Sequence, residues 1–321
     1  MKTVALYWCY GFFTFRVALL SWLHDTVSCC TLKDLMVKQT QPLFHPSHCS
    51  PGDTADATRR ALLMGLTWLA AGCSPLERAP QAEVPAWTRQ GKLRVAINHG
   101  NAVLARKDPQ TGELSGVSVD IGRELGRQLN LPVELIAFDA ANKSVEAVRS
   151  GQADLGFFAI DPLRSEGLQF TAPYVVIEGA YVVPSSSAIQ SLEAVDRAGV
   201  RVAVAAKSAY DLYLSRSIRQ ATLVKTVRSD QVVDMMLSQQ LEVAAGVKQQ
   251  LERDMQRVSG LRMLQPSFMQ IQQAMATADG HPKGARYLRR FVEQLKASGF
   301  VHQALARHRI EGVTVPPASP A

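Results

Sequence analysis

Short apolar strands alternate with amphipathic helices from residue 92 onward, and this alternation most restricts the fold that the chain can adopt. Residues 92–97 and 133–138 have the length and apolar content of buried strands. Between them, residues 120–130 repeat an apolar side chain every four positions, which is typical of a helix. A helix over 144–150 and a strand over 153–160 continue the order. Repeated strand–helix–strand units predict an α/β fold in which helices cover a parallel or mixed sheet.

A second strand–helix set follows a break at Pro184-Ser185-Ser186-Ser187. Residues 200–205 have the pattern of a strand, and helices are expected to begin at Ser208 and Ser229. Two α/β blocks of similar size on either side of a break predict two lobes with a cleft between them. Ligands of open α/β sheets bind where the carboxyl ends of strands meet helix N-termini, so the cleft is the expected binding site.

The segment before the alternating region has the features of a secretory signal. Residues 59–72 contain an Arg-Arg pair, an apolar run and small residues, and Cys73 follows them. Leu69-Ala70-Ala71-Gly72-Cys73 resembles the bacterial lipobox, in which the cysteine receives lipid and becomes the new N-terminus; a buried helix is the alternative. We expect residues 1–58 to be a non-native upstream extension or disordered, and residues 73–91 to be a linker behind the lipid anchor.

Charge and cysteine content exclude several classes of protein. The net charge of +7 is modest for 321 residues and is scattered among acidic neighbours, so no nucleic-acid partner is expected. All five cysteines lie at or before Cys73, which leaves neither a disulfide framework nor a zinc site in the body of the chain. Phosphate-binding loops, Gly-x-Ser-x-Gly and His-Glu-x-x-His are absent from the sequence. We therefore expect no catalytic residue, no metal and no cofactor.

Four short motifs occur in a fixed order along the alternating region. Residues 112–120 read Gly-Glu-Leu-Ser-Gly-Val-Ser-Val-Asp, and residues 151–154 read Gly-Gln-Ala-Asp. Residues 161–164 read Asp-Pro-Leu-Arg, and residues 170–174 read Phe-Thr-Ala-Pro-Tyr. In order and spacing these motifs resemble those of the extracellular solute-binding proteins of family 3, which serve polar amino-acid ABC transporters.

The resemblance implies a type II periplasmic-binding-protein fold, in which the chain crosses twice between two lobes. On this pattern residues 92–183 form the first part of lobe 1 and residues 184–268 form lobe 2. Residues 269–312 return to lobe 1, and residues 313–321 form a disordered tail. The hinge is expected near 181–184 and 269–274.

The resemblance also implies where an anionic group of the ligand is held. In the family, the arginine that matches Arg164 grips the ligand's carboxylate, and its planar fork suits both oxygens. The alternative is a structural arginine paired with Asp161 or Glu166. Ser208 and Ala209 match the helix start whose N–H groups hold an anion in the family, and a plain N-cap at Ser208 is compatible with that role.

Other positions matched to the family's site differ from its pattern. Asn98 and Asn101 occupy the first loop, where the family usually offers an aromatic ring. Phe157 lies where the family tends to have a hydroxyl, and strand alternation places either Phe157 or Phe158 in the core. Val247 stands where an Asp pairs with the ligand's α-ammonium. We therefore expect a carboxylate-bearing ligand other than an ordinary free amino acid, unless Asp161 or Asp211 replaces the missing carboxylate.

Together these features predict the substrate-binding component of an ABC transporter. The expected partners are a small carboxylate-bearing solute, an amino-acid-like molecule or an organic acid, and an inner-membrane permease. We expect a periplasmic monomer anchored to a membrane through lipid on Cys73. A ligand-sensing lipoprotein without a permease and a cyclohexadienyl-dehydratase-like enzyme are the alternatives. Enzymatic activity is the less favoured of these, because the matched motifs supply no acid or base.

Overall fold

The computed structural model describes residues 91–319. The predicted extension at 1–58, the signal at 59–72, Cys73 and most of the linker at 73–91 lie outside the described residues. The order of elements agrees with the alternation expected from the sequence. The first set comprises β1 (Leu93–Asn98), β2 (Arg106–Lys107), β3 (Leu114–Ser115), α2 (Val117–Leu129), β4 (Val133–Phe138), α3 (Ala141–Arg149), β5 (Leu155–Ala159), α4 (Pro162–Ser165) and β6 (Leu168–Pro184).

A second set of strands and helices follows β6, and the chain then returns to the first set. The second set comprises β7 (Arg201–Ala205), α5 (Ala209–Ser217), β8 (Thr222–Thr226), the 3₁₀ turn η2 (Ser229–Gln231), α6 (Val232–Ser238), β9 (Val243–Val247), α7 (Lys248–Arg257) and β10 (Leu261–Met263). The return comprises β11 (Met269–Ala278), α8 (Pro282–Ala297) and α9 (Phe300–Arg307).

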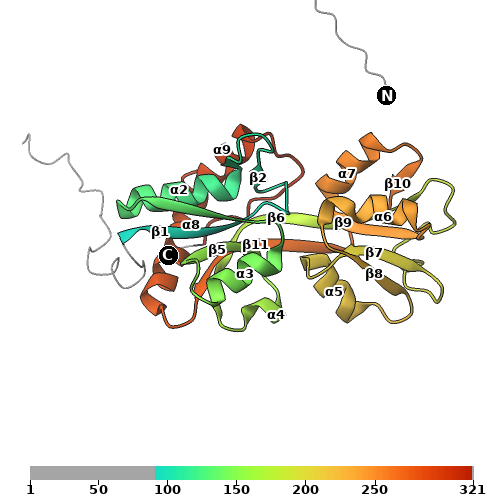
Figure 1. The fold of residues 1–321 in the computed structure, drawn as a ribbon, viewed down its shortest axis with the longest axis horizontal. Helices are drawn as coiled ribbons and strands as arrows, with labels where there is room; N and C mark the ends of the chain where they lie inside the picture. The colour runs from blue at the N-terminus through green and yellow to red at the C-terminus, as the bar shows by residue number, and fades with distance from the viewer. Residues whose placement is uncertain (1–90, 320–321) are drawn as a thin grey trace, which may run out of the picture. The chain divides into compact units, whose positions relative to one another are not determined.

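Two long strands join the two sets. Within residues 91–319 the main sheet has the order β4-β1-β5-β11-β6-β9-β7-β8, with β10 paired to the end of β6. The first half of β6 pairs with β11, whereas its last residues pair with β9 and β10. The hydrogen-bonded path is therefore continuous although the strands belong to two α/β sets (Figure 1). We refer to the β1–β5, α8 and α9 side as the first lobe and to the β7–β10 side as the second lobe.

Gly179 is the residue of β6 at which the pairing changes. It lies opposite Met269 of β11 and also opposite Val247 of β9. A Cβ atom at this position would come within 2.6 Å of Met269 Cγ, so the close approach of β11 requires glycine. The change of partner comes slightly before the hinge segment expected at 181–184. The apolar pattern of β6 continues through the crossing, so no sequence feature marks the residue at which the pairing changes.

Separate hydrophobic cores support the two lobes. In the first lobe, α2, α8 and α9 cover one face of the sheet through residues such as Leu125 and Phe291, and α3 covers the other face (Figure 1). The second lobe has its own core, which includes Val204, Leu214 and Met236. Val247 contacts both cores and therefore lies at the junction of the lobes.

The chain end does not form the disordered tail expected from residue 313. Thr314 forms a two-way backbone bridge with Val176, and the Lys296 ammonium donates to the Pro317 carbonyl at 3.2 Å. Val313 and Val315 pack against the first core. Two alternating valines are too few to read as a strand in the sequence, but the open edge of β6 provides their partner.

Candidate functional site

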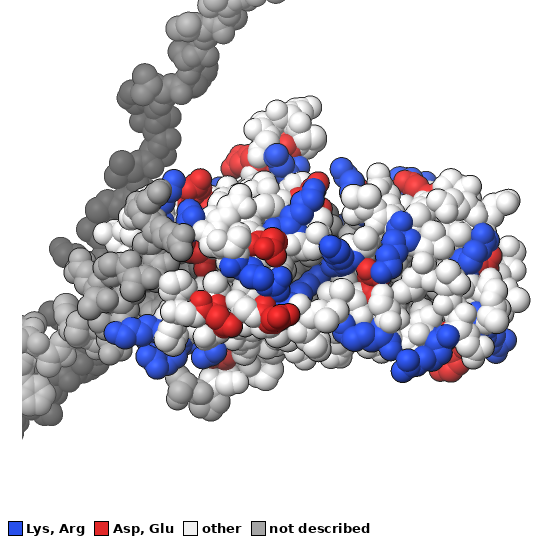
Figure 2. Space-filling view, turned by 60° about the horizontal axis from the view of Figure 1, so that its bottom comes forward, with Lys and Arg blue, Asp and Glu red and all other residues white. Residues whose placement is uncertain are grey.

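A cavity lies between the lobes, where the surface is hollowed and bordered by basic side chains (Figure 2). Its volume is about 70 Å³. One buried water needs about 10–15 Å³, so the cavity has room for a small solute. The first lobe contributes the first loop, the β4–α3 junction, β5, α4 and β11 to the lining. The second lobe contributes the end of β7, the start of α5, η2 and the β9–α7 junction. Seven residues singled out in the sequence line it: Asn98, Asn101, Phe157, Arg164, Ser208, Ala209 and Val247.

Arg164 is a nearly buried cation without an acidic partner. Its side chain on α4 is 5% exposed and donates to the backbone carbonyls of Lys207 at 3.0 Å and Ala159 at 3.4 Å. No carboxylate of residues 91–319 forms an ion pair with it. Burial lowers the pKa of Arg164 to about 10, although the charge of Asp161 acts in the opposite direction. The structure thus gives no support to the alternative of a pair with Asp161 or Glu166.

Asp161 does not line the cavity, in contrast to the prediction that included it among ligand-binding residues. Its Oδ1 accepts from the Leu163 N–H at 2.9 Å and caps α4. Its Oδ2 accepts from Arg216 Nη2 of the second lobe at 2.7 Å. Both oxygens are therefore engaged, which explains why Arg164 three residues later remains without a carboxylate.

The start of α5 forms the second-lobe wall of the cavity. Ser208 is the N-cap, and its hydroxyl accepts from the Asp211 N–H at 3.1 Å. The N–H groups of Ala209 and Tyr210 make no hydrogen bond within residues 91–319, so they are free to meet an anion. Asp211 is 1% exposed and accepts from the Lys207 N–H and the Lys225 ammonium. Asp211 thus holds the turn together and does not reach the cavity.

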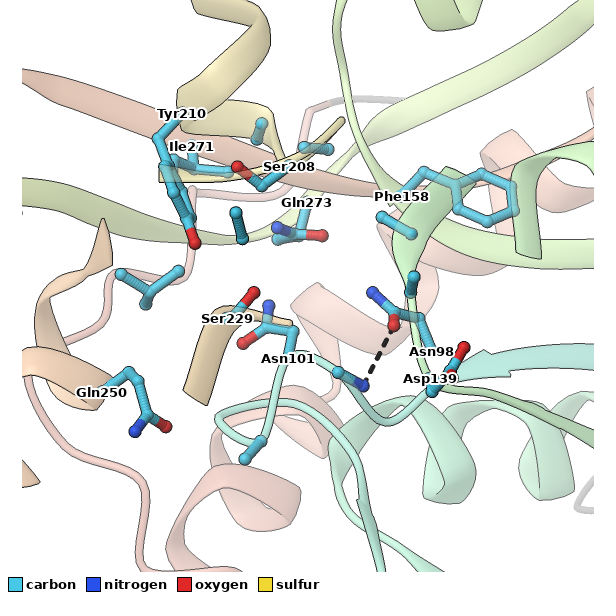
Figure 3. A pocket seen from close by; sticks show the side chains of 18 of the residues that line it. Asn98, Asn101, Asp139, Phe158, Ser208, Tyr210, Ser229, Gln250, Ile271 and Gln273 are labelled. Atoms are coloured by element: carbon cyan, nitrogen blue, oxygen red, sulfur yellow. Dashed lines mark hydrogen bonds between the residues drawn. The ribbon is translucent and has the colours of Figure 1, made fainter. Parts of the chain in front are cut away.

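The first loop presents two amide side chains to the cavity (Figure 3). Asn98 Oδ1 accepts from the Gly100 N–H at 3.0 Å, and Asn101 Oδ1 accepts from the Val103 N–H at 3.3 Å. These bonds hold each carboxamide by its oxygen and leave the NH₂ groups as donors. A Cβ atom on Gly100 would come within 2.2 Å of the Asp139 carbonyl, so only glycine allows the loop to lie this close to the backbone that follows β4.

The two phenylalanines of β5 enter opposite cores, as strand alternation requires. Phe157 packs edge-on to Tyr174 at a centroid distance of 5.8 Å, and Phe158 packs over Gly156. Both residues contribute to the cavity lining, yet their side chains are at most 5% exposed. Each ring is therefore mainly core, and only part of its surface faces the cavity.

Several lining residues were not identified from the sequence. Gln273 of β11 is 6% exposed and its amide, which makes no hydrogen bond within residues 91–319, faces the cavity (Figure 3). A glutamine at an inward position of an apolar strand was the available signal. Ser229 and Gln250 line the cavity from η2 and α7. They lie in polar helix starts, where sequence alone does not separate a lining residue from a solvated one.

Tyr210 lies on the helix that begins at Ser208, and its hydroxyl points into the cavity (Figure 3). Its side chain is 2% exposed and the hydroxyl has no well-formed hydrogen bond within residues 91–319. Burial raises the pKa of this hydroxyl, while the nearby hydroxyls of Ser229 and Ser208 oppose the rise. A buried hydroxyl without a partner is costly, so a ligand or water is its natural partner.

Acidic groups at the cavity are few. Asp139 is the one carboxylate among the described lining residues. Its Oδ1 lies 2.8 Å from the Lys143 ammonium, which holds the pKa of Asp139 below its usual range. His99 stands next to the lining and its pKa is lowered, first by burial and then by the charge of Lys107. Residues 91–319 also contain no cluster of three His, Cys, Asp or Glu side chains suited to a metal ion.

Residues 93–309 match the family model of the bacterial extracellular solute-binding proteins, family 3. The chain belongs to this family. The motifs around Arg164 that resembled the family therefore identified it correctly. Members of the family bind small solutes outside the cytoplasm, in agreement with the periplasmic location expected from the sequence. No helix within residues 91–319 is long and apolar enough to span a membrane.

Solved structures with the same fold include proteins with different roles. A cysteine-binding protein from Campylobacter jejuni is 17% identical, with a TM-score of 0.58 over 68% of this chain and 88% of that one. The ancestral amino acid-binding protein AncCDT-1, a precursor of cyclohexadienyl dehydratase, is 18% identical, with a TM-score of 0.59 over 68% and 94%. A histidine kinase sensor domain with similarity to periplasmic binding proteins is 18% identical, with a TM-score of 0.61 over 70% and 98%.

At these identities the likeness establishes the type II periplasmic-binding-protein fold and no particular ligand. The search of curated protein sequences returned no match. The ligand of this family 3 protein must therefore be inferred from its own cavity.

Proposed function

We propose that this family 3 protein is the substrate-binding component of an ABC transporter and captures a small carboxylate-bearing solute between its lobes. The observation behind the proposal is Arg164, a residue that is 5% exposed, lines the cavity and has no ion pair within residues 91–319. A buried charge is unfavourable until a counter-charge joins it. A ligand carboxylate would supply that charge, and the free N–H groups of Ala209 and Tyr210 lie on the facing wall.

The same cavity offers little to an α-ammonium group. Val247 occupies the junction where the family places an aspartate, and a valine side chain accepts no hydrogen bond. Asp139 is already paired with Lys143. Leaving a buried ammonium unpaired costs several kcal/mol. We therefore infer an organic acid, or an amino acid whose amino group is acylated or otherwise masked.

The transport role rests on closure around the ligand. Arg164 of the first lobe donates to the Lys207 carbonyl of the second, so the same residue that would hold the ligand also joins the lobes. A closed pair of lobes would present the surface that a permease recognises. We further propose that the protein acts as a periplasmic monomer held to a membrane by lipid on Cys73.

A cyclohexadienyl-dehydratase-like enzyme remains an alternative because of the likeness to AncCDT-1. Such an enzyme needs a general acid in the cleft. The one carboxyl group among the described lining residues is that of Asp139, and Lys143 keeps its pKa low, so it is a poor proton donor at neutral pH. The Tyr210 hydroxyl also faces the cavity, but burial raises its pKa and makes it a weak acid. A ligand-sensing role without a permease is the second alternative, in view of the histidine kinase sensor domain.

The proposal is tested by ligand-induced stabilisation followed by calorimetry. A carboxylate ligand present at about 100 times its Kd should stabilise the purified protein by ~2.7 kcal/mol. Arg164→Gln should weaken its binding by about 100-fold or more, because the ligand's charge then lacks its partner. Arg149→Gln is the matched control, since Arg149 lies on α3 and pairs with Glu146 away from the cavity. Unchanged carboxylate affinity in a folded Arg164→Gln protein would refute the proposal.

Uptake measurements separate transport from sensing. Cells that lack the protein should lose uptake of the identified carboxylate and regain it with the wild-type chain but not with the Arg164→Gln chain. Uptake that is independent of the protein would favour the sensing alternative.

A further inference from the structure

Two arginines from opposite lobes lie next to one end of the cavity. Arg106 is on β2 of the first lobe, and its Nε donates to the Ala102 carbonyl at 3.0 Å. Arg253 is on α7 of the second lobe, and its Nη2 donates to Gln250 Oε1 at 2.7 Å. Ala102 and Gln250 both line the cavity. Each guanidinium is thus held by a residue of the cavity wall, one from each lobe.

This end of the cavity lies away from the expected carboxylate site. Gln250 and Phe158 are on opposite sides of the cavity in Figure 3. Arg164 donates to the carbonyl of Ala159, the residue after Phe158. The end of the cavity next to Gln250, whose amide oxygen accepts from Arg253, is therefore away from Arg164.

The charge of Arg106 acts on Arg253 across the cleft, and neither guanidinium has a counter-ion within the described residues. Within residues 91–319 neither Arg106 nor Arg253 forms an ion pair. The pKa of Arg253 is lowered, first by burial and next by the positive charge of Arg106. Its helix neighbours Asp254 and Glu252 act in the opposite direction, but Asp254 already accepts from Gln250 and Arg257.

Like charges brought together across a closing cleft oppose closure. An anion placed between them reverses the sign of the interaction, because each guanidinium can pair with its oxygens. The half-buried position of Arg253 reduces screening by solvent, so the effect is larger than at an open surface.

We propose that Arg106 and Arg253 form an anion subsite at the Ala102–Gln250 end of the cavity, and that the ligand carries a second acidic group there. The inference rests on the proposed function, in which Arg164 holds the first carboxylate. The ligand class is then a small dicarboxylate or a masked acidic amino acid. A ligand with a cationic far end, such as lysine or arginine, meets two like charges and is excluded.

Calorimetry with a matched ligand pair tests the subsite. N-acetylglutamate and N-acetylglutamine have nearly the same shape and differ at the far end by a carboxylate against a neutral amide. The wild-type protein should bind N-acetylglutamate at least about 10-fold more tightly, as expected for one charge-assisted pair. Arg106→Gln and Arg253→Gln should each reduce this ratio toward one. Arg257→Gln is the control on the same helix, because Arg257 pairs with Asp234 and Asp254.

A second measurement does not depend on the ligand chosen. Sodium sulfate, compared with sodium chloride at equal ionic strength, should raise the melting temperature of the wild type more than that of Arg106→Gln or Arg253→Gln. An equal rise in all three proteins refutes the subsite. A ratio near one for the ligand pair in the wild type refutes the second acidic group. The second acidic group is also refuted if sulfate stabilises the wild type but its presence leaves the affinity for N-acetylglutamate unchanged. The subsite then binds an inorganic anion and not a group of the ligand.

Failure of the subsite is distinguishable from failure of the proposed function. If the subsite alone is wrong, Arg164→Gln still strongly weakens carboxylate binding, whereas Arg106→Gln and Arg253→Gln bind the ligands as the wild type does. If the proposed function is wrong, Arg164→Gln does not change the affinity for any carboxylate ligand, and this holds for either outcome of the sulfate experiment.

Discussion

Arg216 and Asp161 form a salt bridge across the cleft, with both guanidinium Nη atoms on the two carboxylate oxygens at 3.3 and 2.7 Å. Arg216 is on α5 of the second lobe, and Asp161 caps α4 of the first. The Asp161 side chain is 6% exposed and that of Arg216 is 41% exposed. The pair therefore joins the lobes directly beside Arg164, outside the cavity.

We expect Arg216→Gln to favour opening of the cleft. Removal of a partly exposed pair costs about 1 kcal/mol, which corresponds to about a fivefold faster ligand dissociation if the pair forms only on closure. Stopped-flow or surface-plasmon measurements of the dissociation rate provide the check. Arg219→Gln is the control, because the Arg219 side chain lies on the exposed surface of the same lobe. An unchanged dissociation rate would mean that the bridge persists when the lobes open.

Val247→Asp should give the protein affinity for ordinary amino acids. The new carboxylate would reach the cavity and pair with an α-ammonium, as in the family's pattern. Asp is a favoured N-cap residue, worth about 1 kcal/mol, and this gain at the start of α7 offsets part of the apolar contact that Val247 makes with both cores. Calorimetry with the standard amino acids is the measurement. Val247→Asn caps equally well but carries no charge, so a gain by both variants would contradict the electrostatic explanation.

Lys207→Gly should leave ligand binding within about twofold and should not destabilise the protein. Lys207 has a positive φ of 59°, which costs a residue with a side chain roughly 1 kcal/mol. Its exposed side chain makes no hydrogen bond within residues 91–319, whereas its N–H and C=O hold Asp211 and Arg164. Chemical denaturation and calorimetry test this against Lys207→Ala, which keeps the unfavourable φ. Weaker binding in both variants would show that the ammonium contacts the ligand.

Cys73→Ser should release the protein from the membrane. The expectation follows from the signal-like run at 59–72 and the lipobox-like sequence that ends in Cys73. Each buried methylene group of an acyl chain contributes about 0.8 kcal/mol to the free energy of membrane binding. Loss of the acyl chains should therefore remove the protein from the membrane fraction. Mass spectrometry of membrane extracts should find an acylated N-terminal Cys73 in the wild type and a soluble product in the variant. An intact N-terminus at Met1 would contradict both the signal and the anchor.

Local sequence was sufficient wherever a feature depends on neighbouring residues. Ser208 was expected to start a helix and does so, because an N-cap needs only its own hydroxyl and the N–H three residues later. The alternation of strands and helices predicted the α/β class, since buried faces repeat with a period that each element sets for itself. The match of Arg164 to a family motif likewise needed only four consecutive residues, and the structure places that side chain in the cavity.

Features that join distant segments were decided by the tertiary structure alone. Asp161 was expected at the ligand, but the approach of Arg216 from the other lobe engages its carboxylate and leaves Arg164 unpaired. Tyr210 has the pattern of core, yet packing buries its hydroxyl against the cavity with no partner.

The sequence by itself determined the elements, the family and the position of the buried cation. Only the tertiary structure decided which charges neutralise one another, because Coulomb interactions depend on separation in space and on burial, and neither follows from separation along the chain.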